Sequence, residues 1–162
     1  MNKNPSKIEF ENVWEHKPDH LIEEIVDTWK SNNLIPPQLD AYERAREVVY
    51  VVRSQGAIIG LTTAKRIMYA TLKNEVFFYR GMVLPQHRIP GIFMKMTTET
   101  IKVLEAYTKA QQGSKPIGVI AELENPKLRE MRLTRLPSGL QLIGFSQRDL
   151  PIYVTYFKDA RF

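Results

Sequence analysis

Three extended runs separated by very short turns limit most strongly what this chain can fold into. The runs are "EVVYVVR" (47–53), "AIIGLTTAKRIMYA" (57–70) and "EVFFYRGMVL" (75–84), and they are rich in β-branched and aromatic residues. The segments "SQG" and "LKN" connect them. Connections this short join antiparallel neighbours, because a parallel pair needs a crossover of about a dozen residues or more. The sequence therefore predicts an antiparallel meander of three strands.

The segments around the meander alternate between helical and extended patterns. We expect helices from Pro18 onward and at about 37–46, 91–110 and 125–136, and further strands at 7–14, 117–123, 140–145 and 151–157. A right-handed crossover through helix 91–110 would place strand 117–123 beside strand 75–84 and parallel to it. The expected fold is α/β (α+β), with a mixed, mostly antiparallel sheet of six to seven strands and helices on both faces, in a single domain over residues 1–162.

Composition excludes several classes of protein. The chain has 162 residues, of which 43% are apolar and 25% charged, which suits one globular core. No apolar stretch approaches the ~20 residues that span a bilayer, and the N-terminus lacks the apolar segment of a signal peptide, so we expect a cytoplasmic protein without a membrane partner. Cysteine is absent, which excludes disulfides, thiolate catalysis and cysteine-ligated zinc. His16 and His20 have i,i+4 spacing, but Pro18 between them indicates a helix start, and we expect no metal site.

The charge is moderately basic. The net charge is +5 and the sequence pI is about 9.4, which favours anionic partners such as nucleic acid or a phosphate-rich cofactor, or simply a solubilising surface. The charged residues of the expected helix 125–136 are Lys127, Arg129, Glu130, Arg132 and Arg135. This helix is either a solvated face or a surface for a phosphate group, an acidic partner or a nucleic acid. No clear array of stacking aromatics accompanies it, so nucleic acid is not the favoured partner, and a homodimer stays open.

The stretch "LPQHRIPGIF", residues 84–93, joins a predicted strand to a predicted long helix. The N-terminus of that helix would present free backbone N–H groups and a dipole that favours an anion. Arg88 adds a planar guanidinium that fits phosphate, with Gln86 and His87 beside it. An alternative is an ordinary turn in which Gly91 relieves crowding and Arg88 is solvated. Taken alone, the stretch favours the ordinary turn over the phosphate loop.

Over most of its length the chain resembles the GCN5-related N-acetyltransferase (GNAT) superfamily. "GMVLPQHRIPGI" is similar to the family's acetyl-CoA loop, in which an Arg or Gln, a Gly and a final Gly or Ala follow a strand; Arg88 and Gly91 fill the first two places. "VIAELENPKL" resembles the fifth strand with its helix-capping Asn, "GLQLIGF" the strand after it, and "VVYVVRSQGAIIGLTTA" the second and third strands. The order of elements is the strongest part of this resemblance.

The resemblance implies that acetyl-CoA is the co-substrate and indicates where it binds. In the family, backbone at the end of the fourth strand pairs with pantetheine, which here implicates Met82, Val83 and Leu84. The loop residues implied at the diphosphate are Gln86, His87, Arg88, Ile89, Gly91 and Ile92. The family's capping Asn, often a cofactor contact, maps to Asn125, which otherwise is a helix cap only.

The loop departs from the family pattern in three places. Ile89 and Pro90 occupy positions that are often Gly and Lys, and proline has no N–H to offer a phosphate. Phe93 occupies the last signature position, usually Gly or Ala. We expect Phe93 to face the core instead, where it would extend the helix stripe of Met96 and Leu104.

Acetyl transfer to an amine needs a neutral amine, a polarised thioester carbonyl and a proton for the leaving thiolate. The N–H near Val83 is the expected polarising group. Glu75, Tyr79 and Glu122 are candidate bases, although residues of these types are more often surface carboxylates or packed phenols.

The usual general acid of the family is missing. Many members carry a Tyr on the helix after the capping Asn, whereas this chain has Arg132 there. Tyr153, Tyr156 or water would then protonate the thiolate.

The resemblance thus implies an acyl-CoA-dependent N-acyltransferase, a transferase that moves acetyl from acetyl-CoA to an amine that the sequence does not name. The alternative is a degenerate, non-catalytic domain of the same fold that binds a protein or nucleic-acid partner. The missing Tyr and the altered loop favour that alternative.

Overall fold

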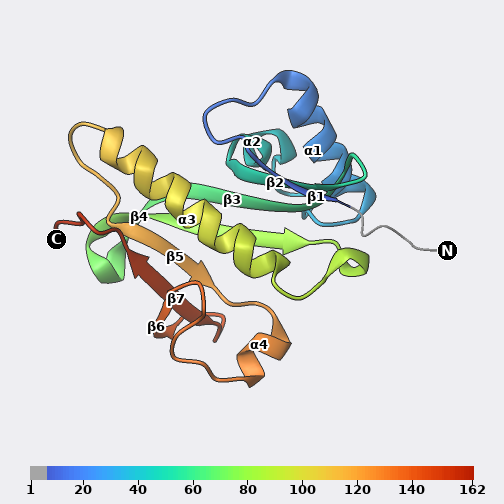
Figure 1. The fold of residues 1–162 in the computed structure, drawn as a ribbon. Helices are drawn as coiled ribbons and strands as arrows, with labels where there is room; N and C mark the ends of the chain where they lie inside the picture. The colour runs from blue at the N-terminus through green and yellow to red at the C-terminus, as the bar shows by residue number, and fades with distance from the viewer. Residues whose placement is uncertain (1–6) are drawn as a thin grey trace. The chain divides into compact units, whose positions relative to one another are not determined.

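The computed structural model describes residues 7–162, which form a mixed sheet with four α-helices along this part of the chain. In chain order the elements are β1 (Ile8–Asn12), α1 (Asp19–Ser31), α2 (Ala41–Arg46), β2 (Val48–Ser54), β3 (Ala57–Tyr69), a 3₁₀ helix (Ala70–Leu72), β4 (Asn74–Val83), a 3₁₀ helix (Pro85–His87), α3 (Ile92–Ala110), β5 (Gly118–Glu122), α4 (Pro126–Glu130), β6 (Gln141–Phe145) and β7 (Pro151–Tyr156) (Figure 1). The strand order is β1-β2-β3-β4-β5-β7-β6. Strands β4 and β5 are parallel, whereas the pairs β1–β2, β2–β3, β5–β7 and β6–β7 are antiparallel. The expected mixed, mostly antiparallel sheet is confirmed, with seven strands.

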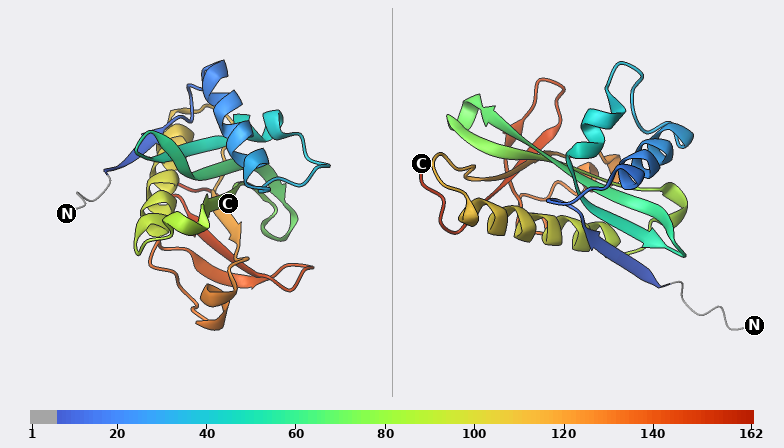
Figure 2. Two further views of the ribbon diagram at one scale, coloured as in Figure 1. Left: turned by 90° about the vertical axis from the view of Figure 1, so that its right-hand side faces the viewer. Right: turned by 90° about the horizontal axis from the view of Figure 1, so that it is seen from above.

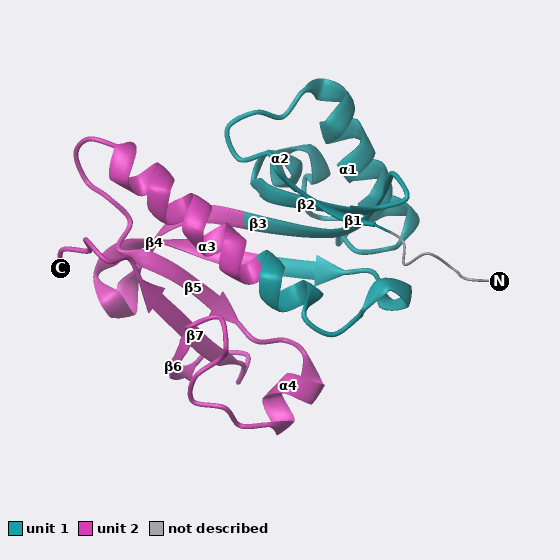
Figure 3. Cartoon of the chain, viewed as in Figure 1, with its two compact units in different colours: residues 1–63, 81–96 teal, residues 64–80, 97–162 magenta. Residues whose placement is uncertain are grey.

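The chain divides into two compact units. Unit 1 comprises Met1–Thr63 and Gly81–Met96, and unit 2 comprises Ala64–Arg80 and Thr97–Phe162 (Figure 3). The boundaries of the units fall within β3, β4 and α3, so each of these elements has residues in both units. The expectation of one acyltransferase domain over the whole chain stays a prediction.

In unit 1, helix α1 forms where the sequence pattern predicts it. Pro18 precedes its first turn, Asp19 adds an acidic residue there, and the helix covers the β2–β3 hairpin (Figure 1, Figure 2). Its buried stripe is Leu21, Ile22, Ile25, Val26 and Trp29. Each fully buried side chain of this size contributes about 1.5–3 kcal/mol of transfer free energy. Helix α2 starts later than the expected residue 37, because the Asp40 side chain accepts from the N–H groups of Tyr42 and Glu43 and caps it there.

The β2–β3 hairpin turns at Gln55 and Gly56, whose φ angles of 52° and 82° are those of a tight I′-type turn. Side chains alternate across the two strands. Val51 and Leu61 pack with α1, whereas Val52 and Ile59 pack with Val83, Ile92 and Met96. Unit 1 therefore has helical residues on both faces of its strands, as the sequence predicts.

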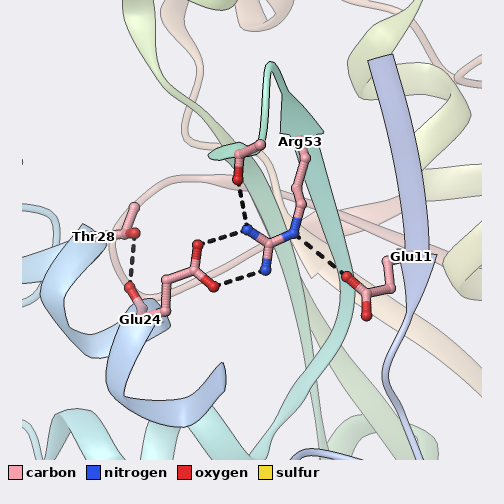
Figure 4. A network of polar contacts seen from close by, with 5 residues as sticks. Glu11, Glu24, Thr28 and Arg53 are labelled. Atoms are coloured by element: carbon pink, nitrogen blue, oxygen red, sulfur yellow. Dashed lines mark hydrogen bonds and ion pairs between the residues drawn. The ribbon is translucent and has the colours of Figure 1, made fainter. Parts of the chain in front are cut away.

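A charged network ties three elements of unit 1 together (Figure 4). Arg53 of β2 donates to both carboxylate oxygens of Glu24 on α1, at 2.6 and 2.7 Å, and to Glu11 of β1 at 3.5 Å. It also donates to the Gly56 carbonyl at 2.9 Å. Because Arg53 reaches all of these groups, it fixes the edge strand β1 and helix α1 against the same hairpin.

In unit 2, the crossover through α3 places β5 parallel to β4, with Phe77 opposite Val119 and Phe78 opposite Ile120. Ile117 donates its N–H to the Glu75 carbonyl at 2.8 Å just before this ladder. Val76, Ile117, Ile120 and Ile152 form a buried cluster between β4, β5 and β7. The predicted parallel neighbour of strand 75–84 is confirmed.

Candidate functional site

The end of β4 is anchored in the core of unit 1. Val83 and Leu84 are each only 6% exposed, while Met82 is half-buried. The Leu84 N–H donates to the Ile59 carbonyl at 2.8 Å, so this amide is already engaged by β3. A 3₁₀ turn over Pro85–His87 follows and carries the chain off the sheet.

Helix α3 begins on a left-handed glycine. Gly91 has a φ of +85°, a conformation that L side chains rarely adopt. The first bond with helical spacing runs from the Lys95 N–H to the Gly91 carbonyl at 3.0 Å. N–H groups that precede this bond, such as that of Met94, point out of the helix N-terminus. The first turn carries no acidic residue, so nothing in that turn competes electrostatically with a bound anion.

Arg88 lies between the strand and the helix. Its Nε donates to the Val83 carbonyl at 3.1 Å, and its side chain takes part in no ion pair within residues 7–162. Gln86, Ile89 and Pro90 around it are exposed, and Ile89 is 51% exposed. Arg88 is therefore exposed in the segment just before α3, which suits both a phosphate loop and an ordinary turn with a solvated arginine.

Phe93 does not extend the buried stripe of α3, which corrects the expectation. Its side chain is 38% exposed, whereas Ile92 is 5% exposed and packs with Val83 and Met96. A side chain advances about 100° per helical residue, so a stripe that continues through Met96, Thr100 and Leu104 starts from Ile92. Lys95 stands over the Phe10 ring of β1, with Nζ 4.2 Å from the ring centroid.

Glu75 is held in an ion pair at the amino-terminal end of β4. Its carboxylate accepts from Arg66, through Nε at 2.9 Å and through Nη2, and from the Ser114 hydroxyl at 2.9 Å. The Arg66 guanidinium and then the Ser114 hydroxyl lower the pKa of Glu75. A carboxylate stabilised in this way is a weak base, so the geometry does not favour the predicted catalytic role.

Tyr79 is packed inside unit 2. It is 4% exposed, and its hydroxyl lies 2.8 Å from the Thr97 hydroxyl. Burial raises the pKa of the Tyr79 phenol above its usual range, although the hydrogen bond to Thr97 opposes this. The phenol is therefore neutral and shielded from solvent, which fits a packed tyrosine better than a base.

Glu122 lies at the carboxyl end of β5. Arg148 Nη2 donates to it at 2.5 Å and to Glu124 at 2.9 Å, and the Glu122 side chain is 19% exposed. The two carboxylates raise the pKa of Arg148, Glu122 contributing most. Of the three predicted bases, only Glu122 lies at a strand end where ligands of such sheets bind.

The two tyrosines considered as substitute acids have different surroundings. The Tyr153 hydroxyl donates to the Leu133 carbonyl at 2.6 Å, and burial raises the pKa of this phenol. Tyr156 is 42% exposed, and its ring meets the Phe162 ring edge-on at 5.2 Å.

No protein-family model matches the chain, and no curated protein sequence matches it. Solved structures do: yncA of Salmonella typhimurium, determined with acetyl-CoA as its cofactor, has a TM-score of 0.65 at 12% identity, over 96% of each chain. The ribosomal-protein-S5-alanine acetyltransferase of Vibrio fischeri has a TM-score of 0.65 at 11% identity, over 95% of each chain. The KacTA complex with DNA has a TM-score of 0.59 at 12% identity, over 94% of each chain.

The chain has the GNAT fold.

The GNAT fold places the segment with the acetyl-CoA-loop resemblance where β4, the 3₁₀ turn and α3 meet. Among residues 7–162, none of the helices combines the length and the apolar character that a membrane span requires. No group of three or more His, Asp or Glu side chains in this range is placed to share a metal ion. His16 precedes α1 and His20 lies within it, so the two do not share a helix face.

Asn125 caps α4, as the GNAT resemblance implies. Its side-chain oxygen accepts from the Lys127 N–H at 3.0 Å, with Pro126 at the first helical position. The helix is shorter than predicted, however, and ends at Glu130 instead of residue 136. Arg132 follows it with a φ of +47°, so it lies off the helix and cannot replace the family's helical Tyr.

Gly60 lies near this site and was not predicted from the sequence. Gly60 of β3 faces the end of β4, and a Cβ at this position would lie 3.1 Å from the Met82 carbonyl and 3.2 Å from the Met96 methyl group. The signal was present, because a glycine inside a strand often marks a close approach of another backbone. Gly60 thus lets β3 and the end of β4 pack without a side chain between them.

Proposed function

We propose that this chain is an acyl-CoA-dependent N-acyltransferase that moves acetyl from acetyl-CoA to an amine. The observation that carries the proposal is the junction of β4 with α3. There a left-handed glycine opens a helix without acidic residues in its first turn, and an arginine without an ion pair in residues 7–162 lies beside it. This combination suits a diphosphate, and the likeness to yncA with acetyl-CoA supports the same ligand.

The residues present fit coenzyme A at this junction. N–H groups at the N-terminus of α3 and the Arg88 guanidinium would hold the diphosphate, and Val83 would offer its backbone to pantetheine. The Val83 carbonyl now accepts from Arg88 Nε. When Arg88 turns toward a phosphate, this carbonyl becomes free to accept a hydrogen bond from the ligand. Leu84 is already bonded to β3, so Val83 and Met82 are the better candidates for pantetheine pairing.

In the transfer, the amine nitrogen attacks the thioester carbonyl carbon, a C–N bond forms and the C–S bond breaks. The chain must remove one proton from the amine, and the thiolate must gain one. We keep Glu122 as the candidate base, with Arg148 turning away to release its carboxylate. Glu75 and Tyr79 are poor candidates, for the reasons of charge and burial given above. Asn125 remains a proposed cofactor contact in addition to its cap.

A thermal-shift measurement with acetyl-CoA, CoA and no ligand tests this function. A ligand at about a hundredfold over its Kd stabilises by ~2.7 kcal/mol, which raises the Tm of a chain of this size by roughly 5–10 °C. The Arg88→Ala variant should lose most of this shift. Arg161 is another exposed arginine that forms no ion pair within residues 7–162. Arg161→Ala therefore removes the same charge and should keep the Tm shift. The absence of a Tm shift with millimolar acetyl-CoA would exclude the acyltransferase function.

A second candidate is a non-catalytic domain of the same fold that binds a macromolecular partner. The bond from Arg88 Nε to the Val83 carbonyl favours it, because this carbonyl already has a hydrogen-bond partner without a ligand. Pro90 and the exposed Phe93 in the loop favour it as well. In this case CoA and acetyl-CoA should leave the Tm unchanged in every variant.

A further inference from the structure

A basic segment follows β5 in unit 2, and neither acetyl transfer nor the core of the unit uses its charges. We define the basic segment as residues 126–135, "PKLREMRLTR", which contains α4. Its charged residues are Lys127, Arg129, Glu130, Arg132 and Arg135, four cations against one anion. All five are exposed. In Figure 1 and Figure 3, α4 projects from unit 2 beyond the ends of the strands.

The cations of the basic segment, like Arg88 and Arg161, form no ion pair with an acidic residue of the described chain. Several arginines elsewhere do pair with carboxylates, as Arg53 does with Glu24, Arg66 with Glu75 and Arg148 with Glu122. Within residues 7–162, none of the four cations of the basic segment takes part in an ion pair. Their positive charge is therefore not neutralised within the described chain.

The backbone of the basic segment is fixed. Asn125 caps its start, the Arg132 N–H donates to the Arg129 carbonyl at 3.1 Å, and Arg132 is held in the left-handed region. Farther on, the Tyr153 hydroxyl donates to the Leu133 carbonyl at 2.6 Å, and the Leu142 N–H donates to the Thr134 carbonyl at 2.8 Å. Because these bonds to β6 and β7 hold the backbone, a ligand would need to order only the side chains of the four cations.

The chemistry of the exposed groups points to phosphate. Three of the four cations are arginines, whose planar fork matches a phosphate group. Met131, 58% exposed, is the one exposed large apolar side chain of the segment. A protein partner would be expected to meet an apolar or aromatic centre, which the segment lacks. Without aromatic side chains the segment cannot stack bases either. We propose that the basic segment binds the phosphate backbone of a nucleic acid without reading its sequence.

Fluorescence anisotropy of a labelled single-stranded RNA and a DNA duplex, over a series of KCl concentrations, tests this proposal on the full chain. Four phosphate contacts give a slope of log K against log salt of about −3.6 for duplex DNA and about −2.8 for a single strand. A variant with Lys127→Gln, Arg129→Gln, Arg132→Gln and Arg135→Gln should bind at least about tenfold more weakly at low salt, with a slope near zero.

A control variant removes the same charge elsewhere in unit 2. The changes Lys109→Gln, Lys115→Gln, Lys158→Gln and Arg161→Gln also take the net charge from +5 to +1, and all four residues are exposed. This variant should bind nearly as the unaltered chain does. Circular dichroism melts establish that both variants are folded. If the quadruple variant of the basic segment unfolds, single substitutions within the segment replace it, and each should reduce the magnitude of the salt slope by about one.

Three results would overturn the proposal. The first is no binding of either oligonucleotide at low salt, and the second is equal weakening by the two quadruple variants. The third is binding of poly-glutamate as tightly as of the oligonucleotides, which would make an acidic protein the partner. The proposal does not rest on acetyl transfer, because acetyl-CoA is absent from these measurements.

Discussion

Gly91 is the residue whose backbone most directly shapes the proposed cofactor loop. With a φ of +85°, it starts α3 in a conformation that costs an L residue about 1–2 kcal/mol. A Cβ there would meet no atom within 4 Å, so the cost of substitution is conformational and not steric crowding by neighbours. Gly91→Ala should lower the free energy of unfolding by about 1 kcal/mol in urea titrations.

Gly91→Asn is the matched comparison, because asparagine tolerates the left-handed region better than alanine. It should lower the free energy of unfolding less than alanine does. Equal effects of the two substitutions would contradict the conformational explanation.

Glu24 gives a pH-dependent contribution to stability. Its hydrogen bonds with Arg53 lower its pKa in the folded state, while its unfolded pKa is about 4.3. The stabilisation is therefore fully present above about pH 4.3 and is lost as the pH falls through the lowered folded value. Because the Glu24 side chain is 40% exposed, solvent screens the pair, and Glu24→Gln should cost only about 0.5–1 kcal/mol at pH 7.

Urea unfolding at pH 7 and near pH 3 measures the difference between the unaltered chain and Glu24→Gln at each pH. The difference should shrink at the lower pH. Glu15→Gln removes the same charge from an exposed residue for which the described chain shows no ion pair, and it should have little effect at either pH. A Glu24→Gln effect that stays constant with pH would show that the ion pair is not its source (Figure 4).

At the scale of elements, α4 depends on its cap because it is only five residues long. A helix this short has little stability of its own. Asn125→Ala should lower the free energy of unfolding by about 1 kcal/mol, whereas Asn125→Asp keeps the capping oxygen and should change it little. Chemical denaturation of the two variants checks this, and equal stabilities would mean that the cap is not needed.

The start of α4 could be predicted from "NP", but its end could not. The sequence holds no Gly or Pro between Asn125–Pro126 and Pro137, so a helix to residue 136 was the natural expectation. The chain leaves the helix because β7 and β6 compete for its backbone, through Tyr153 on the Leu133 carbonyl and Leu142 on the Thr134 carbonyl. Such partners are distant in sequence, and a local pattern does not reveal them.

The candidate site also contains residues that a local pattern predicts and residues whose partners are distant in sequence. The positions of Gly91 and Arg88 between β4 and α3 follow from a local pattern, whereas their role in binding CoA stays a prediction. The surroundings of Glu75 and Tyr79 depend on Arg66, Ser114 and Thr97, which no spacing rule connects to them. For Phe93 the prediction is wrong by a single helical position, because the buried stripe of α3 starts from Ile92.

At the scale of the whole molecule, the likeness to solved structures establishes the fold but not the activity. Identities of 11–12% carry an architecture that hosts different substrates, so function has to be argued from residues such as Arg88. The loop at β4 belongs to unit 1 and the basic segment to unit 2, and a different ligand is proposed for each. The acceptor amine of the first and the nucleic acid of the second are to be identified independently.

An NMR titration of the ¹⁵N-labelled chain with acetyl-CoA shows whether this ligand binds where β4 meets α3. The amides expected to shift most are those of Val83, His87, Arg88, Gly91 and Ile92. Arg88→Ala should abolish these shifts at the same ligand concentration, and Arg161→Ala should preserve them. Unchanged amide signals throughout this loop at millimolar acetyl-CoA, or shifts confined to other elements, would contradict binding at this junction.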